Sequence, residues 1–164
     1  MARQVIAIEA MTDYARGITL NIGQISGGTA ENVVPQTCTA AIDLRVVTMA
    51  DADEMHRRLA ALKPYGRDVT VEVTGAMNRL PYEETAAGRA LFLHAREIAA
   101  ILGIDLEGMH TGGGSDGNFT AHTVATLDGL GCDGAAAHTL NEHLFISSLV
   151  PRKLLLQGLM STLR

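Results

Sequence analysis

The order of helix-period and strand-period segments near the N-terminus is the feature that most constrains the fold of this chain. Apolar residues recur with the helical period in two segments, and they alternate with polar residues, as in strands, in three others. The segments run in the order helix (2–15), strand (17–26), strand (37–47), helix (50–63) and strand (68–75). This order predicts an α+β unit built around a small sheet.

The five segments make up most of a ferredoxin-like βαββαβ unit whose opening strand is absent. The second helix has clear boundary signals, because Asp51 and Asp53 lie near its positive N-terminal end and Lys63 precedes Pro64. We therefore expect an incomplete ferredoxin-like domain over residues 1–77. Its unpaired strand edges would favour self-association.

A change of pattern near residue 78 predicts a second domain over residues 78–164. Pro81 and the acidic pair Glu83 and Glu84 precede its first helix. Its expected elements are a helix (85–102), a strand (104–108), a glycine loop backed by a helix, a strand (124–130), a loop (131–143) and a helix (149–163). Strands that alternate with helices predict a parallel α/β layer. Two short strands are too few for a sheet covered on both faces, so we expect a portion of a larger domain.

Composition excludes several classes of protein. Apolar residues make up 47% and charged residues 19% of the chain, which is typical of a globular protein. A net charge of −5 and an aromatic content of 4% disfavour a nucleic-acid partner. No apolar run is long enough to span a bilayer or to act as a signal peptide. Cys38 and Cys132 form neither a disulfide framework nor a CxxC metal motif. We expect a cytoplasmic protein without a membrane partner.

The strongest candidate site is the stretch MHTGGGSDGNFTAH at residues 109–122. Glycines let a ligand approach the backbone closely, so N–H groups ahead of a helix could hold a carboxylate or a peptide carbonyl. The glycine spacing fits neither of the common phosphate-binding fingerprints. Gly113, Ser115 and Gly117 satisfy the Gly-x-Ser-x-Gly pattern, which leaves a serine hydrolase open. A tight turn without a ligand is also open.

Other polar residues could carry chemistry, and each has a simpler explanation. His138 and His143 are five residues apart, which excludes the HExxH zinc helix and leaves His138 as a ligand or a surface residue. Arg45, on the polar face of a strand, offers a planar fork for a carboxylate or is merely solvated. Asn32, shortly before Pro35, is a functional residue or a turn residue.

Three ordered segments resemble the C-terminal half of the M20 zinc peptidases, the group of carboxypeptidase G2, succinyl-diaminopimelate desuccinylase and acetylornithine deacetylase. GGTAENVVPQTCTAAIDLRV is similar to the family's lid hairpin, and TGGGSDGNF is similar to its substrate loop. LDGLGCDGAAAHTLNEHLFISSLVPRKLLLQGLM is similar to its zinc-ligand loop and last helix. The resemblance implies a lid or dimerisation domain at 1–77 and the C-terminal α/β part of a zinc-peptidase catalytic domain at 78–164.

The implied activity is that of a carboxypeptidase or amidohydrolase, similar to glutamate carboxypeptidases. It would cleave the amide bond next to a free carboxylate in a small peptide or an N-acyl amino acid. By the same resemblance His138 would be a zinc ligand and Arg45 would bind the substrate's free carboxylate. Asn32 would reach across a homodimer and polarise the scissile carbonyl in the partner's active site.

The resemblance also implies roles for the glycine loop. Gly113, Gly114 and Ser115 would contact the substrate backbone, and Asp116 would brace the loop. His110 would be a further substrate contact. It stands where glutamate-preferring members have an Arg immediately before Thr-Gly-Gly-Gly, so the resemblance does not imply a preference for a C-terminal glutamate.

The family's two-zinc centre takes a His, a bridging Asp, further carboxylates and its catalytic Glu from an N-terminal half that the resemblance does not cover. Catalytic zinc needs about three protein ligands, of which His138 would be one. We therefore expect the isolated chain to retain no catalytic zinc, to be inactive, and to form dimers or larger species. A non-catalytic dimerisation or carboxylate-binding module is the alternative. The exact substrate, the origin of Met1 and an N-terminal half supplied in trans are left open.

Overall fold

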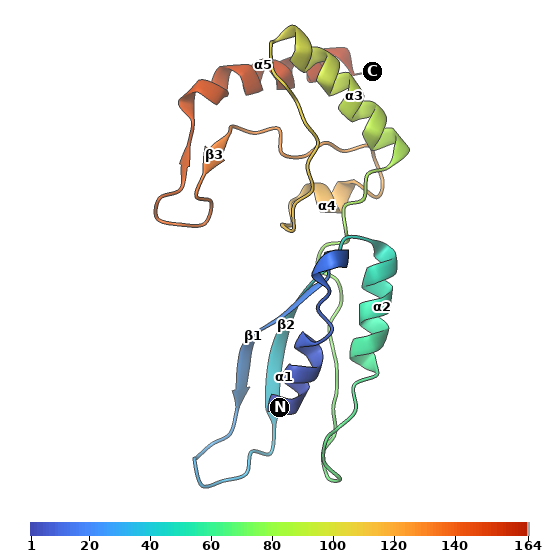
Figure 1. Ribbon diagram of the computed structural model, residues 1–164, viewed down its shortest axis with the longest axis vertical. Coiled ribbons are helices and arrows are strands. Elements are labelled where there is room, and N and C mark those ends of the chain that lie inside the picture. The colour runs from blue at the N-terminus through green and yellow to red at the C-terminus, as the bar shows by residue number, and fades with distance from the viewer. Residues whose placement is uncertain (164) are drawn as a thin grey trace. The chain divides into compact units, whose positions relative to one another are not determined.

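Residues 1–163 are described by a computed structural model, and the chain divides into two units. The N-terminal unit is Met1–Glu83 and the C-terminal unit is Glu84–Arg164. Figure 1 shows the first in blue to green and the second in green to red. Each unit is described by itself below.

The N-terminal unit contains an antiparallel hairpin and two α-helices. Its elements are α1 (Ala2–Glu9), the 3₁₀ turn η1 (Tyr14–Arg16), β1 (Thr19–Gly27), β2 (Cys38–Arg45) and α2 (Met49–Ala60). Thr19 pairs with Arg45 at one end of the hairpin and Gly27 with Cys38 at the other, with a bulge between Ile22 and Gln24. The first four predicted segments are confirmed, although α1 ends at Glu9 because η1 follows it.

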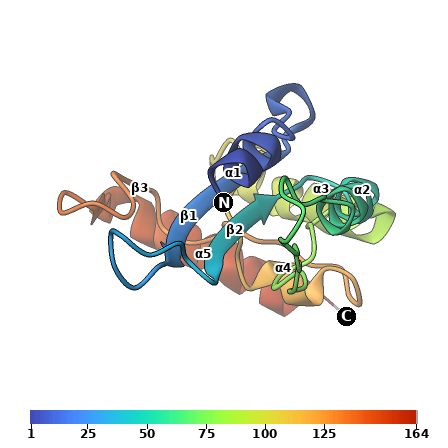
Figure 2. The ribbon, with the colours of Figure 1, turned by 90° about the horizontal axis from the view of Figure 1, so that it is seen from below.

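One face of the hairpin packs against the two helices, as the alternating pattern requires. Ile18 and Leu20, beside or within β1, are buried together with Ile8 of α1 and with Met55 and Leu59 of α2. These apolar residues form the core of the unit. Figure 2 shows α1 lying against the hairpin from a second direction. Burial of such side chains is the main favourable term in folding.

The third strand predicted for this unit, at residues 68–75, is wrong. These residues lie in a segment without helix or strand between α2 and the end of the unit, seen in Figure 1 as a green trace without an arrow. Their valines have the period of a strand, but no second backbone within residues 1–163 pairs with them. Periodicity selects an extended conformation, and only a partner turns it into a strand.

The C-terminal unit is built on two packed helices. Its elements are α3 (Ala86–Ile101), α4 (Gly117–Thr120), β3 (Gly134–Ala135), β4 (His143–Leu144) and α5 (Ile146–Thr162). The core joins two alanines of α3 to two leucines of α5, namely Ala95, Ala99, Leu155 and Leu159. A Cβ on Gly158 would lie 2.7 Å from Ile98 Cγ2, so α5 needs glycine where it approaches α3. The two long helices predicted here are confirmed.

The parallel strands predicted at 104–108 and 124–130 are wrong. Neither segment forms a ladder, and the sheet that exists is the two-residue antiparallel pair β3–β4. Ile104, Leu106 and Leu127 pack beside the α3–α5 core, which explains their apolar character without a sheet. The mixed helices and small sheets agree with the α+β class, whereas the full ferredoxin-like arrangement is not observed in the N-terminal unit.

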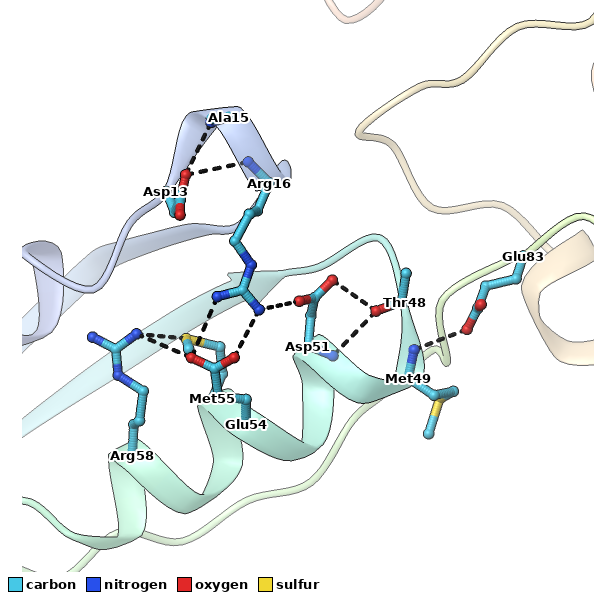
Figure 3. A network of polar contacts seen from close by, with 10 residues as sticks. All are labelled: Asp13, Ala15, Arg16, Thr48, Met49, Asp51, Glu54, Met55, Arg58 and Glu83. Carbon is cyan, nitrogen blue, oxygen red and sulfur yellow. Dashed lines mark hydrogen bonds and ion pairs between the residues drawn. The ribbon is translucent and has the colours of Figure 1, made fainter.

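A polar network joins η1 to the start of α2 (Figure 3). The Asp13 side chain accepts hydrogen bonds from the Ala15 and Arg16 backbone N–H groups, which shapes the turn. The Arg16 guanidinium then donates to Glu54 at 2.7 Å and to Asp51, both on α2. The hydrogen bond to Glu54, followed by that to Asp51, raises the pKa of Arg16. The turn after α1 is thereby tied to the second helix.

The same network caps α2 at its N-terminus. Thr48 Oγ1 accepts from the Asp51 N–H at 3.1 Å and donates to the Asp51 carboxylate at 2.7 Å. Glu83 Oε1 accepts from the Met49 N–H at 2.9 Å. These bonds satisfy two of the donors that a helix leaves unpaired at its start. The bond from Thr48, followed by that from Arg16, lowers the pKa of Asp51, and Arg16 lowers the pKa of Glu54.

Arg16→Met is expected to destabilise the N-terminal unit at neutral pH and to have little effect in acid. Depressed carboxylate pKa values stabilise the fold above the unfolded pKa values of Asp and Glu, about 4, and that stabilisation is lost as the pH falls through the folded values. Thermal unfolding followed between about pH 7 and pH 3 measures this. Arg57→Met, on the same helix, is the control. Equal losses at both ends of the range would contradict the network's role.

Candidate functional site

Asn32 and Arg45 lie at opposite ends of the β1–β2 hairpin. Asn32 is exposed in the connection between the strands, and Arg45 is the last residue of β2, opposite Thr19. The length of β2, from Cys38 to Arg45, separates the two ends by roughly 23 Å at about 3.3 Å per residue. One small substrate cannot contact both residues of the same copy.

Arg45 presents its guanidinium to solvent next to an acidic neighbour. Arg45 Nε donates to Asp43 Oδ2 at 2.9 Å, and both side chains are more than half exposed. Exposed ion pairs of this kind contribute little to stability because water competes for both partners. A substrate carboxylate could therefore replace Asp43 on the fork, or bind beside it.

The glycine loop ends in a reciprocal pair of hydrogen bonds. Asn118 Oδ1 accepts from the Ser115 N–H at 2.8 Å, and Ser115 Oγ accepts from the Gly117 N–H at 3.1 Å. The two bonds join Ser115 to Gly117 and Asn118, the first two residues of α4. They fix the short helix α4 behind the loop. The Ser115 N–H is already hydrogen-bonded within the loop.

The conformation and packing of the loop do not themselves require glycine. Neither Gly112 nor Gly113 is among the glycines of positive φ. A Cβ on Gly112 would meet nothing within 4 Å, and one on Gly113 would lie 3.7 Å from Thr111 Oγ1, an ordinary contact. The space beside the loop is therefore open. Gly114 and the exposed His110 belong to the same stretch, which has neither helix nor strand.

Ser115 lacks the setting of a hydrolase nucleophile. A nucleophile elbow joins a strand to a helix, and residues 104–114 contain no strand. Its hydroxyl oxygen serves α4 as a hydrogen-bond acceptor. Asp116, next in the chain, immediately precedes α4, and its side chain makes no capping bond to the helix.

His138 lies in the tight connection between β3 and β4. Its φ of 65° is in the left-handed region, which is uncommon for a residue with a side chain, and its N–H donates to Glu142 Oε2 at 3.0 Å. Thr139 Oγ1 donates to the Ala136 carbonyl at 2.8 Å and closes the turn. The loop holds the backbone of His138 firmly and leaves the residue exposed.

His143 is less suited than His138 to act as a metal ligand, because its ring already makes other contacts. Its Nδ1 lies 2.7 Å from the Asn141 carbonyl oxygen, and its ring contacts Phe145 edge to face with centroids 5.4 Å apart. Residues 1–163 contain no group of three His, Cys, Asp or Glu side chains that could hold a metal ion. The described donors therefore do not fit a complete zinc centre, which needs about three protein ligands.

Sequence reasoning missed two of the residues that shape these loops. Asn118 secures Ser115, and Glu142 secures His138. The Ser-x-x-Asn spacing was the available signal for the first, because a side-chain acceptor three residues after a Ser can bond back to the Ser N–H near a helix start. The bond to Glu142 depends on the left-handed backbone at His138, which residue type does not reveal.

A match to a known family decides the assignment. A family described as the peptidase dimerisation domain of the M20 peptidases matches residues 1–63, which include α1, both strands of the hairpin and α2. The chain belongs to the M20 peptidase family. The matched family is one of dimerisation domains. No helix among residues 1–163 has the length and apolar character needed to cross a membrane.

Curated relatives align with most of this M20 chain. Succinyl-diaminopimelate desuccinylase of Acinetobacter baylyi is 30% identical over 141 residues, which cover 85% of this chain and 37% of the relative. The enzymes of the same name from Azoarcus and Thioalkalivibrio sulfidiphilus are 30% and 32% identical over 81% and 80% of the chain, and 35% of each relative is covered. The chain thus spans about a third of the length of these relatives.

Asn118→Ala is expected to loosen the glycine loop without unfolding the unit. Loss of the acceptor frees the Ser115 amide, so its hydrogen exchange should accelerate by about fivefold to tenfold, which corresponds to the roughly 1 kcal/mol of a helix cap. Exchange measured by NMR tests this. Asn141→Ala is the matched control, since no hydrogen bond of the Asn141 side chain is part of the loop. Unchanged exchange at Ser115 would contradict the capping role.

Proposed function

We propose that this chain carries the dimerisation domain and part of the substrate and metal apparatus of an M20 zinc metallopeptidase. The reaction would be hydrolysis of an amide bond next to a free carboxylate. The observation that carries the proposal is the family match over the N-terminal unit, continued by alignment of the chain with desuccinylases. The relatives' name suggests an N-succinyl amino acid as the substrate class. A small glutamate-terminated peptide, as in glutamate carboxypeptidases, is the other candidate substrate class.

Arg45 is proposed to recognise the substrate's carboxylate. Its guanidinium is exposed at the end of β2, and Asp43, with which it forms an ion pair, is also more than half exposed. A bidentate bond to a substrate carboxylate would be stronger than that pair, because both N–H groups on one edge of the fork are used. Asn32, at the other end of the hairpin, is proposed to act in the partner's active site. The length of the hairpin supports that assignment.

The glycine loop is proposed to receive the substrate backbone. The open space beside Gly112 and Gly113 lets a ligand approach the main chain, and Asn118 holds the end of the loop. Gly114, Ser115 and His110 would line the same contact, with Asp116 behind it. Because the Ser115 N–H is engaged, the glycine backbone would make the direct contacts.

His138 is proposed to supply one ligand to the zinc centre that the family resemblance implies. When bound, zinc would supply Lewis-acid polarisation of the carbonyl and an acidified water. The described residues do not complete that centre, so we propose that its other donors come from polypeptide outside them. The chain by itself would then hold zinc weakly and would not hydrolyse the substrate.

Equilibrium dialysis against zinc tests the metal assignment. The chain alone is expected to bind zinc weakly, and His138→Ala should abolish that binding while His143→Ala, the matched control, retains it. Tight binding of one or more equivalents, with hydrolysis of an N-succinyl amino acid by the chain alone, would show that a complete centre forms without further polypeptide.

A titration with an N-acyl amino acid tests carboxylate recognition without metal. N-succinyl and N-acetyl amino acids are expected to shift the NMR signals of Arg45 at millimolar concentration. Arg45→Gln should weaken the affinity by about tenfold, as expected for a hydrogen bond to a charged group. Arg57→Gln, on α2, is the control. Equal affinity in the two variants would remove Arg45 from the substrate site.

A further inference from the structure

The C-terminal unit contains three Asp–Gly pairs, at residues 116–117, 128–129 and 133–134. In such a pair the main-chain nitrogen of the glycine can attack the side-chain carboxyl of the aspartate. Glycine favours this attack, because it has no Cβ to obstruct the approach and its backbone rotates freely. The three pairs share this sequence and differ in their surroundings, so the structure distinguishes which of them can react.

The pair Asp116–Gly117 is restrained at the start of α4. Asp116 has the helical angles φ −70° and ψ −22°, and the Gly117 N–H donates to Ser115 Oγ at 3.1 Å. The Asp116 carbonyl accepts from the Phe119 N–H at 3.0 Å. The peptide between Asp116 and Gly117 would have to rotate out of this conformation, and break these bonds, before the nitrogen could reach the carboxyl group.

The pair Asp133–Gly134 is restrained at three points of its aspartate. The Asp133 N–H donates to Ser148 Oγ at 3.0 Å, and the Asp133 carbonyl accepts from the Phe145 N–H at 2.8 Å. Asp133 Oδ1 accepts from Arg152 at 2.6 Å. Gly134 belongs to β3, which pairs with β4. The carboxyl group and the peptide that follows it are therefore both held in place.

The pair Asp128–Gly129 has no such restraint. Both residues are exposed, and neither forms a hydrogen bond or an ion pair with any other of residues 1–163. Gly129 has a φ of 69°, and a Cβ placed on it would meet nothing within 4 Å. On either side, Leu127 and Leu130 pack beside the α3–α5 core. Asp128 and Gly129 thus form an exposed bend between two anchored side chains.

We propose that Asp128 is a site of spontaneous isomerisation to isoaspartate. The Gly129 nitrogen forms a bond to Cγ of the protonated Asp128 carboxyl group, and one carboxyl oxygen leaves as water with the proton of the nitrogen. Water then opens the resulting succinimide at either carbonyl. One opening restores aspartate, and the other leaves the main chain running through the Asp128 side chain. The net reaction gains and loses no atoms, needs no oxidant or reductant, and is independent of the proposed function.

Isomerisation would act on the core of the C-terminal unit. The isoaspartyl linkage adds one carbon to the main chain between Leu127 and Leu130, which both pack beside the α3–α5 core. The bend must deform or one leucine must shift, and close-packed interiors tolerate such shifts poorly. The modified linkage is also the chemical group that a protein isoaspartyl methyltransferase recognises, so this class of repair enzyme is the partner that the site fits.

Prolonged incubation of the whole chain in warm neutral buffer tests the proposal. Peptide mass spectrometry with electron-transfer fragmentation then measures isoaspartate at each pair. Asp128 should isomerise at least about fivefold faster than Asp116 or Asp133, since those two must first lose hydrogen bonds of ordinary strength. Equal rates at the three sites, or a faster rate at Asp116 or Asp133, would overturn the proposal.

The same incubation in concentrated urea separates the effect of the fold from that of neighbouring residues. The three rates should converge in the unfolded chain. An excess at Asp128 that persists in urea would show that the fold does not select the site.

Asp128→Glu provides the matched variant, because glutamate keeps the charge and forms its larger imide ring slowly. Methyl transfer by a protein isoaspartyl methyltransferase should lose most of its signal in the aged Asp128→Glu chain and keep it in aged Asp133→Glu. Circular dichroism verifies that both variants fold. An undiminished signal in Asp128→Glu would also overturn the proposal.

Discussion

An extended segment becomes a strand only when a second backbone receives its N–H and C=O groups, and much of this structure depends on that requirement. The backbone N–H and C=O groups of β1 and β2 pair with each other in an antiparallel hairpin. Residues 69–74, with an equally strong strand pattern, have no partner within residues 1–163 and remain unpaired. Because hydrogen bonding in sheets is non-local, the same pattern yields a strand in one place and a segment without helix or strand in another.

The helices are less dependent on distant partners, since their backbone bonds are internal. Apolar side chains on α2 close the core over the hairpin, and those on α5 pack against the alanines of α3. Polar caps then define where the helices begin. Thr48 and Thr85 each accept a backbone N–H three residues later. Arg16 adds a bond between the turn that follows α1 and the acidic side of α2.

The candidate site residues occupy loops and element ends beside these cores. Ser115 is secured by Asn118 and His138 by Glu142, so the loops are ordered by local hydrogen bonds. Arg45 depends on the hairpin for its position. Each loop offers one or two polar groups, and residues 1–163 gather no group of three His, Cys, Asp or Glu side chains that could hold a metal ion.

The sequence by itself determined the elements whose signals are local. The spacing of apolar residues predicted α2, α3 and α5. The alternation of apolar and polar residues predicted the β1–β2 hairpin, which carries Asn32 in its connection and Arg45 at its end. The order of its motifs was enough to indicate the M20 family. Tertiary structure decided what depends on distant groups. It left residues 68–75, 104–108 and 124–130 outside any strand ladder among the residues that the structure describes, placed the left-handed His138 in the β3–β4 turn, and bonded the Ser115 N–H to the Asn118 side chain. The physical reason is that periodicity sets which face of a segment is apolar, whereas pairing depends on which backbone and side-chain groups the fold brings within hydrogen-bond reach.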